Sequence, residues 1–97
     1  MSTLHVLSHS PFGDERFGSC LRILGSQDAL LLCGDATYAL QPGTQPFQAL
    51  QALHQQRFVL LEDAQARGLA IADWIVAIDY PAFVELSVRH DKVNTWL

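Results

Sequence analysis

At 97 residues the chain is long enough for one domain, spanning residues 1–97, but too short for two self-sufficient cores. Hydrophobic residues make up 49% of it and charged residues only 16%, against about 25% in a typical globular protein, so surplus apolar side chains should reach the surface and be covered by a partner. The net charge of −4, without any Lys/Arg cluster, argues against direct contact with nucleic acid.

The beginning of the sequence does not have the pattern of a signal peptide. Residues 1–8 carry no positively charged segment, and His5 and Ser8 interrupt their apolar run. No stretch approaches 18 consecutive apolar residues, so no membrane-spanning helix and no membrane partner are predicted. We expect a cytoplasmic protein in which Cys20 and Cys33 are free thiols, because disulfides are rare in a reducing compartment and the spacing of these cysteines is not that of a zinc site.

The first part of the chain predicts a strand, a helix and a second strand. Residues 4–7 form a short apolar run that the turn-forming residues 8–11 end. Within residues 14–25, apolar side chains recur at the spacing of one helix face; they are Phe17, Cys20, Leu21 and Leu24. Residues 29–33 are continuously apolar, which favours a strand covered on both faces inside a parallel sheet, and a turn at Gly34 should follow.

The second part of the chain continues the alternation. After a loop at Pro42, Thr44 can cap a helix that reaches His54. In the last predicted helix, Val84 and Val88 lie beside the main apolar face. The remaining elements are expected to be a strand at 58–61, a helix at 62–67, a strand at 74–78, a helix at 81–90 capped by Asp79 or Tyr80, and a short strand at 92–96.

This order of elements predicts the fold class. The connections between successive strands are too long for hairpins, which favours right-handed β-α-β units with parallel strands. We therefore predict an α/β protein with three layers, α/β/α, around a mostly parallel sheet of about five strands.

The sequence gives no indication of a cofactor or a metal ion. The phosphate-binding motifs GxGxxG and GxxxxGK[ST] are absent, and a phospho-acceptor domain would need acidic residues where the first strand is followed by Ser8-His9-Ser10. His5 and His9 would lie about 13 Å apart along an extended chain, too far to share a metal ion. His5 is interpreted as a buried or edge polar group with a hydrogen-bond partner.

Cys20 is the candidate residue for sulfur chemistry. A thiolate can accept and pass on sulfur, and Arg16, one turn earlier on the same predicted helix, could favour ionisation of the thiol. However, Cys20 belongs to the apolar helix face, so packing in the core is the favoured interpretation. Cys33, at the end of a predicted central strand, is interpreted as inert.

Glu62 and Asp63 follow the third predicted strand, at the edge where open α/β sheets bind ligands. Two carboxylates there could serve acid–base chemistry. The same residues also stabilise the beginning of a helix by facing its positive end, and this second interpretation is favoured.

Four segments, in one order along nearly the whole chain, resemble the TusB/DsrH family, which supplies the small subunit of DsrEFH-type sulfur-relay proteins. Asp35 followed by Tyr38-Ala39 also fits this resemblance. The four segments are Leu4-His5 with Leu7 and Ser10-Pro11; Glu62-Asp63 with Ala66-Arg67-Gly68-Leu69; Ile78-Asp79-Tyr80 with Phe83-Val84 and Leu86; and Trp96. Each motif is short, but their joint order is specific.

The resemblance implies a three-layer subunit that joins two paralogous subunits, DsrE/DsrF-like (or TusD/TusC-like), in a heterohexamer of two heterotrimers. It implies that the assembly relays persulfide sulfur through a downstream sulfur-carrier protein toward 2-thiouridine at the wobble position of tRNA, or serves sulfur oxidation in the DsrEFH case. In the family, the central sulfur-carrying cysteine belongs to a paralogous subunit. Cys20 matches a position where DsrH-like members carry a cysteine and some TusB members do not.

Two hypotheses follow. In the first, the chain is a structural and partner-docking subunit without turnover of its own, acting in tRNA thiolation; the lack of any oxidation-specific feature favours that pathway. In the second, the chain is a sulfurtransferase of a DsrEFH-type oxidation pathway, in which Cys20 carries a persulfide and Arg16 assists its ionisation.

Overall fold

The computed structural model describes residues 2–96, and in this range five parallel strands form one sheet in the order β4-β3-β2-β1-β5. The strands are β1 (Thr3–Leu7), β2 (Ala29–Leu32), β3 (Gln56–Leu60), β4 (Val76–Ile78) and β5 (Lys92–Trp96). The helices are α1 (Arg16–Ile23), the 3-10 helix η1 (Gly34–Leu40), α2 (Gln45–Gln51), α3 (Leu61–Ala66) and α4 (Tyr80–Arg89). The predicted α/β class with a parallel five-stranded sheet is confirmed.

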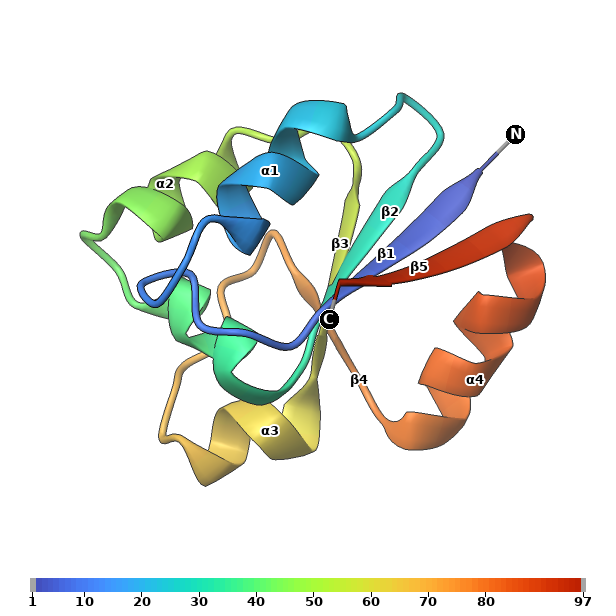
Figure 1. Ribbon diagram of the computed structural model, residues 1–97. Coiled ribbons are helices and arrows are strands. Elements are labelled where there is room, and N and C mark those ends of the chain that lie inside the picture. Colours follow the sequence, from blue (N-terminus) through green and yellow to red (C-terminus); the bar gives the residue numbers. More distant parts are fainter. Residues whose placement is uncertain (1, 97) are drawn as a thin grey trace.

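The helices form two unequal layers. Figure 1 shows α1, α2 and α3 on one face of the sheet and α4 on the other. The connections from β1 to β4 all step in one direction across the sheet, so right-handed crossovers place their helices on one face, whereas the return from β4 to β5 places α4 opposite. Within residues 2–96, no helix of either layer has the length and apolar character needed to cross a membrane.

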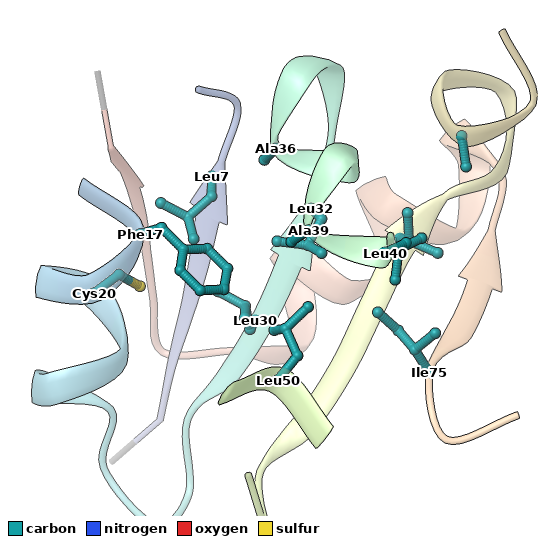
Figure 2. Packing of buried hydrophobic residues seen from close by; sticks show 12 residues of the cluster. Leu7, Phe17, Cys20, Leu30, Leu32, Ala36, Ala39, Leu40, Leu50 and Ile75 are labelled. Atoms are coloured by element: carbon teal, nitrogen blue, oxygen red, sulfur yellow. The ribbon is translucent and has the colours of Figure 1, made fainter. Parts of the chain in front are cut away.

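The larger hydrophobic cluster lies between the sheet and the layer that contains α1 and α2. Leu30 and Leu32 of β2 point into it, where they meet Phe17 of α1 and Leu50 of α2 (Figure 2). Burying a side chain of this size contributes about 1.5–3 kcal/mol relative to leaving it in water. The helix that carries Cys20 is thus fixed to the sheet by the main core.

The smaller cluster lies on the opposite face, under α4. Leu86 is the buried residue of α4, and Ala82 and Phe83 pack beside it. The sheet contributes Leu4, Val6, Ala29, Leu31, Leu60 and Ile78. The Asp79 side chain, one of the two caps that the sequence predicted, caps α4 by accepting a hydrogen bond from the Ala82 N–H over 3.0 Å.

One element was not predicted from the sequence. The sequence predicted a turn at Gly34-Asp35 and no element before the loop at Pro42, whereas residues 34–40 make the helix η1. Its buried Ala36 and Ala39 are small enough for a tight helix to lie against the sheet, and the Thr37 hydroxyl donates to the Gly34 carbonyl over 2.7 Å. Of its four buried residues only Leu40 is large and apolar, so the sequence shows no repeated apolar spacing that would reveal a helix.

Several boundaries also differ from the prediction, two of them at residues singled out in the sequence. β4 begins at Val76 rather than at Trp74, because Trp74 lies in a turn and packs edge-on against Phe47 of α2, with ring centroids 5.2 Å apart. α2 ends at Gln51, which leaves His54 exposed beyond the helix instead of on its apolar side.

Candidate functional site

Cys20 is fully buried. Its side chain has 0% exposure and points from α1 into the main core beside Phe17 (Figure 2). Burial raises the pKa of the Cys20 thiol to about 12, and the negative charge of Asp28 acts in the same direction. At neutral pH Cys20 is therefore a protonated thiol without access to solvent, which is the opposite of the environment that activates a cysteine.

Arg16 is the first residue of α1 and pairs with Asp14 in the preceding loop. Its guanidinium contacts the Asp14 carboxylate, and its backbone N–H donates to Asp14 Oδ1 over 2.9 Å. The charge identified as acting on Cys20 is the negative one of Asp28, which opposes ionisation. A role for Arg16 in assisting a Cys20 thiolate, and a role for Cys20 as sulfur acceptor, remain predictions.

Three residues from distant parts of the chain form a hydrogen-bonded group at the β1–β5 side of the sheet. His5 is buried, and its Nε2 lies 3.2 Å from Asp28 Oδ2. The Trp96 indole N–H donates to Nδ1 of the same ring over 3.1 Å. The prediction that His5 is buried with a hydrogen-bond partner is confirmed, and the partners tie β5 and the turn before β2 to β1.

Asp28 is the acceptor in this group. Its carboxylate receives the backbone N–H groups of Thr3 and Gly25, both over 2.9 Å, in addition to the contact with His5. Burial alone would raise the pKa of Asp28, but these hydrogen bonds and the nearby His5 outweigh it and hold the pKa below its ordinary value. Asp28 is therefore an ionised structural carboxylate rather than a proton donor.

A second polar group lies where β2 and β3 end. The chain turns at Gly34 with φ of +51°, a conformation that favours glycine, and the Gly34 N–H donates to Asp63 Oδ2 over 2.7 Å. The half-buried thiol of Cys33 donates to the Leu7 carbonyl over 3.4 Å. Burial, and then the charge of Asp63, raise the pKa of Cys33, although Arg67 acts in the opposite direction.

Arg67 completes this group at the end of α3. Its guanidinium donates to Asp35 Oδ1 over 2.9 Å and lies 5.7 Å from the centre of the Tyr38 ring. Glu62 and Asp63 form the first turn of α3, as the sequence favoured, and Asp63 also receives the Gly34 bond. Because Arg67 binds Asp35 and Asp63 binds the Gly34 N–H, the group joins α3 to η1, while Glu62 stays exposed in the same turn.

Two hollows lie on the described part of the chain away from Cys20, which lines neither of them. One of about 420 Å³ lies between α1 and the beginning of α2, with Phe17 and Leu21 in its wall and Asp14, Glu15 and Arg22 around it. The other, of about 170 Å³, lies beside α4. Within the described part of the chain, no group of three or more His, Cys, Asp or Glu side chains is placed to hold a metal ion.

The outer side of α4 carries three of the exposed large apolar side chains. Tyr80, Val84 and Val88 follow one another at intervals of four residues, and all three are exposed. Val76 of β4 is exposed on the same side of the sheet. These residues are the surplus apolar surface that the composition predicted, and they make this side of the molecule the best candidate for a functional surface.

Comparison with known proteins identifies similar sequences over almost the whole chain. The family described as "DsrH like protein" matches residues 9–93. Proteins named "Protein TusB" from Escherichia coli O81 (strain ED1a) and from Shigella boydii serotype 18 (strain CDC 3083-94 / BS512) are each 37% identical over 95 residues, covering 96% of this chain and 99% of theirs. The crystal structure of ychN protein from E. coli has the same fold, with a TM-score of 0.77, 20% identity, and coverage of 99% of this chain and 100% of that one.

Proposed function

The chain belongs to the DsrH-like protein family, and we propose that it is a subunit of a sulfur-relay assembly with a structural and partner-docking role. In this proposal it packs against two paralogous subunits, DsrE/DsrF-like or TusD/TusC-like, in a cytoplasmic heterohexamer of two heterotrimers. A cysteine of a paralogous subunit carries the sulfur as a persulfide. The assembly passes it to a downstream sulfur-carrier protein on the route to 2-thiolation of the wobble uridine of tRNA.

The observation that carries this proposal is the 37% identity to Protein TusB over nearly the full length of both chains. The surroundings of Cys20 support the docking role, because a buried, protonated thiol cannot attack a persulfide donor without a change of conformation. The exposed apolar side chains of α4 support a role in contacts, since surfaces of this kind mark protein interaction sites.

The proposal is tested in a bacterial strain that lacks its own TusB and therefore serves as a recipient for this chain. We expect this chain, expressed with its two paralogues, to restore 2-thiouridine measured by mass spectrometry of digested tRNA. The Cys20→Ser variant should restore the same level, because the proposal gives that sulfur no part in the relay. Normal assembly with the paralogues but no recovery of 2-thiouridine would contradict the thiolation role.

We propose a second, alternative function because the DsrH-like match, residues 9–93, includes Cys20. In this alternative the chain is itself a sulfurtransferase of a DsrEFH-type sulfur-oxidation pathway. The Cys20 thiolate would attack the terminal sulfur of a donor persulfide, and the donor would leave as a thiolate. This reaction requires α1 to move so that Cys20 meets solvent, whereas the docking role requires no such change.

A further inference from the structure

Trp96 is the side chain that anchors β5, the strand at the edge of the sheet beside β1 (Figure 1). The other four residues of β5 are exposed, whereas Trp96 is partly buried and packs against the main hydrophobic cluster. The register pairs Trp96 with Leu7, and the indole reaches back along β1 to the ring of His5, with ring centroids 6.2 Å apart. Besides the backbone ladder to β1, the attachment of β5 therefore depends mainly on this one side chain.

The bond between Trp96 and His5 requires a neutral imidazole. The indole N–H donates to Nδ1 over 3.1 Å, so the single proton of the neutral ring lies on Nε2, 3.2 Å from Asp28 Oδ2. A second proton can bind only at Nδ1, because Nε2 already carries one. Two donors, the indole N–H and the new imidazolium N–H, would then face each other. A protonated His5 and the bond from Trp96 therefore exclude one another.

The charges around His5 favour its protonation once Trp96 no longer occupies Nδ1. The nearest charge is that of Asp28, in the turn before β2, and the hydrogen bonds that this carboxyl accepts hold its pKa low against the effect of burial. On α1, burial raises the pKa of Cys20 to about 12, so that this thiol stays neutral. On β5, Lys92 faces the same side of the sheet but is exposed to solvent, and the residues beside His5 in β1 and β2 are uncharged.

We propose that His5 is a pH-sensitive switch for β5: when its ring takes a second proton, Trp96 is released and residues 92–96 separate from the sheet. The attached state binds one proton fewer than the released state, so the attachment is stable at neutral and higher pH and is lost as the pH falls. Because imidazole side chains ordinarily titrate at about pH 6.5, the transition belongs to the mildly acidic range. This inference concerns the fold of the chain and does not depend on the sulfur relay.

The test is amide hydrogen exchange of residues 92–96, followed by NMR at about pH 7.5 and about pH 5.5 and corrected for the intrinsic pH dependence of exchange. We expect the opening constant of β5 to rise about tenfold between these values, because opening takes up one proton. The central strands β2 and β3 should keep their protection. In Trp96→Phe, β5 should open more readily at both values and the pH dependence should disappear, because Nδ1 of His5 is then free to bind a proton in the attached state too.

The matched control is His90→Gln, since His90 also lies beside β5 but its Nδ1, 2.9 Å from the Leu86 carbonyl, can donate there in either protonation state. This variant should keep the full pH response, whereas His5→Gln should lose it because an amide takes no proton in this range. Trp96→Phe decides the question even where His5→Gln does not fold. The proposal is overturned if β5 of the unmodified chain opens equally at both pH values, if all strands open together, or if Trp96→Phe keeps the pH response.

Discussion

The Trp96 indole N–H donates to Nδ1 of His5 over 3.1 Å, which joins β5 to β1 through side chains as well as through the backbone ladder. Since an indole N–H can only donate, Nδ1 of His5 must accept. A neutral His5 ring therefore carries its proton on Nε2, where it can donate to the Asp28 carboxylate 3.2 Å away. The arrangement fixes the tautomer of His5, and nitrogen chemical shifts of a labelled protein should identify Nε2 as the protonated position.

Replacing Trp96 by Phe should lower the free energy of unfolding by about 1–2 kcal/mol, because the buried Nδ1 of His5 loses its donor. Urea unfolding at neutral pH measures the change. Trp74→Phe is the control, since the Trp74 ring lies 5.3 Å from the Arg57 guanidinium and its indole N–H, unlike that of Trp96, donates no hydrogen bond to a residue within 2–96. An equal loss in both variants would show that ring size, rather than the bond to His5, sets the effect.

Asp28→Asn should destabilise the protein by about 2 kcal/mol at neutral pH, because a carboxylate that accepts backbone N–H groups is replaced by a neutral amide. The pKa of Asp28 is held below the ordinary value of 3.8 in the folded state, so its stabilising effect is present above that pH and is lost as the pH falls through the folded pKa. The difference between unmodified protein and variant should therefore shrink in acid. Unfolding of an Asp73→Asn control, which changes an exposed carboxylate, should not show this pattern.

The two cysteines should differ in reactivity toward iodoacetamide. The half-buried Cys33 should be alkylated before Cys20, which is fully buried and has a pKa of about 12. The single-thiol variants Cys20→Ser and Cys33→Ser allow the two rates to be followed separately, and both should become fast in urea. A native Cys20 that reacts first, or that gains one sulfur from a persulfide donor in mass spectrometry, would favour the sulfurtransferase alternative.

Asp63→Ala should destabilise the protein by about 1–3 kcal/mol, because it removes the acceptor that Gly34 N–H reaches over 2.7 Å. Glu62→Ala is a matched control, since Glu62 is an exposed carboxylate in the same first turn of α3. Its effect should stay within about 0.5 kcal/mol, as is usual for surface substitutions. Similar losses in the two variants would mean that a negative charge in the first turn of α3, rather than the bond to Gly34, accounts for the effect of Asp63.

The two sides of α4 show how far hydrophobic spacing predicts structure. The pattern identified the helix and its buried Leu86, and it placed Val84 and Val88 beside that apolar face. Spacing could not show that these valines point away from the sheet, because two apolar arcs on one helix look alike until the partner surfaces are known. In η1 the reverse holds, since a single large apolar residue, Leu40, is buried beside two alanines and a threonine, and this gives no apolar spacing to recognise.

The polar groups were predictable only in part. A histidine inside the apolar run of residues 4–7 had to find a partner, and this expectation is confirmed. Its partners Asp28 and Trp96 lie 23 and 91 positions away, so no local spacing could identify them. The pairing of Arg67 with Asp35 spans 32 positions and escaped prediction for the same reason.

The strand order has a consequence for folding during synthesis on the ribosome. β5 is made after every other strand, yet it pairs with β1, on the side opposite to the one where β2 is added. Until residues 92–96 emerge, β1 presents an open row of backbone donors and acceptors to neighbouring nascent chains. A pause in translation before this segment should therefore leave β1 open to pairing with a neighbouring chain and favour aggregation.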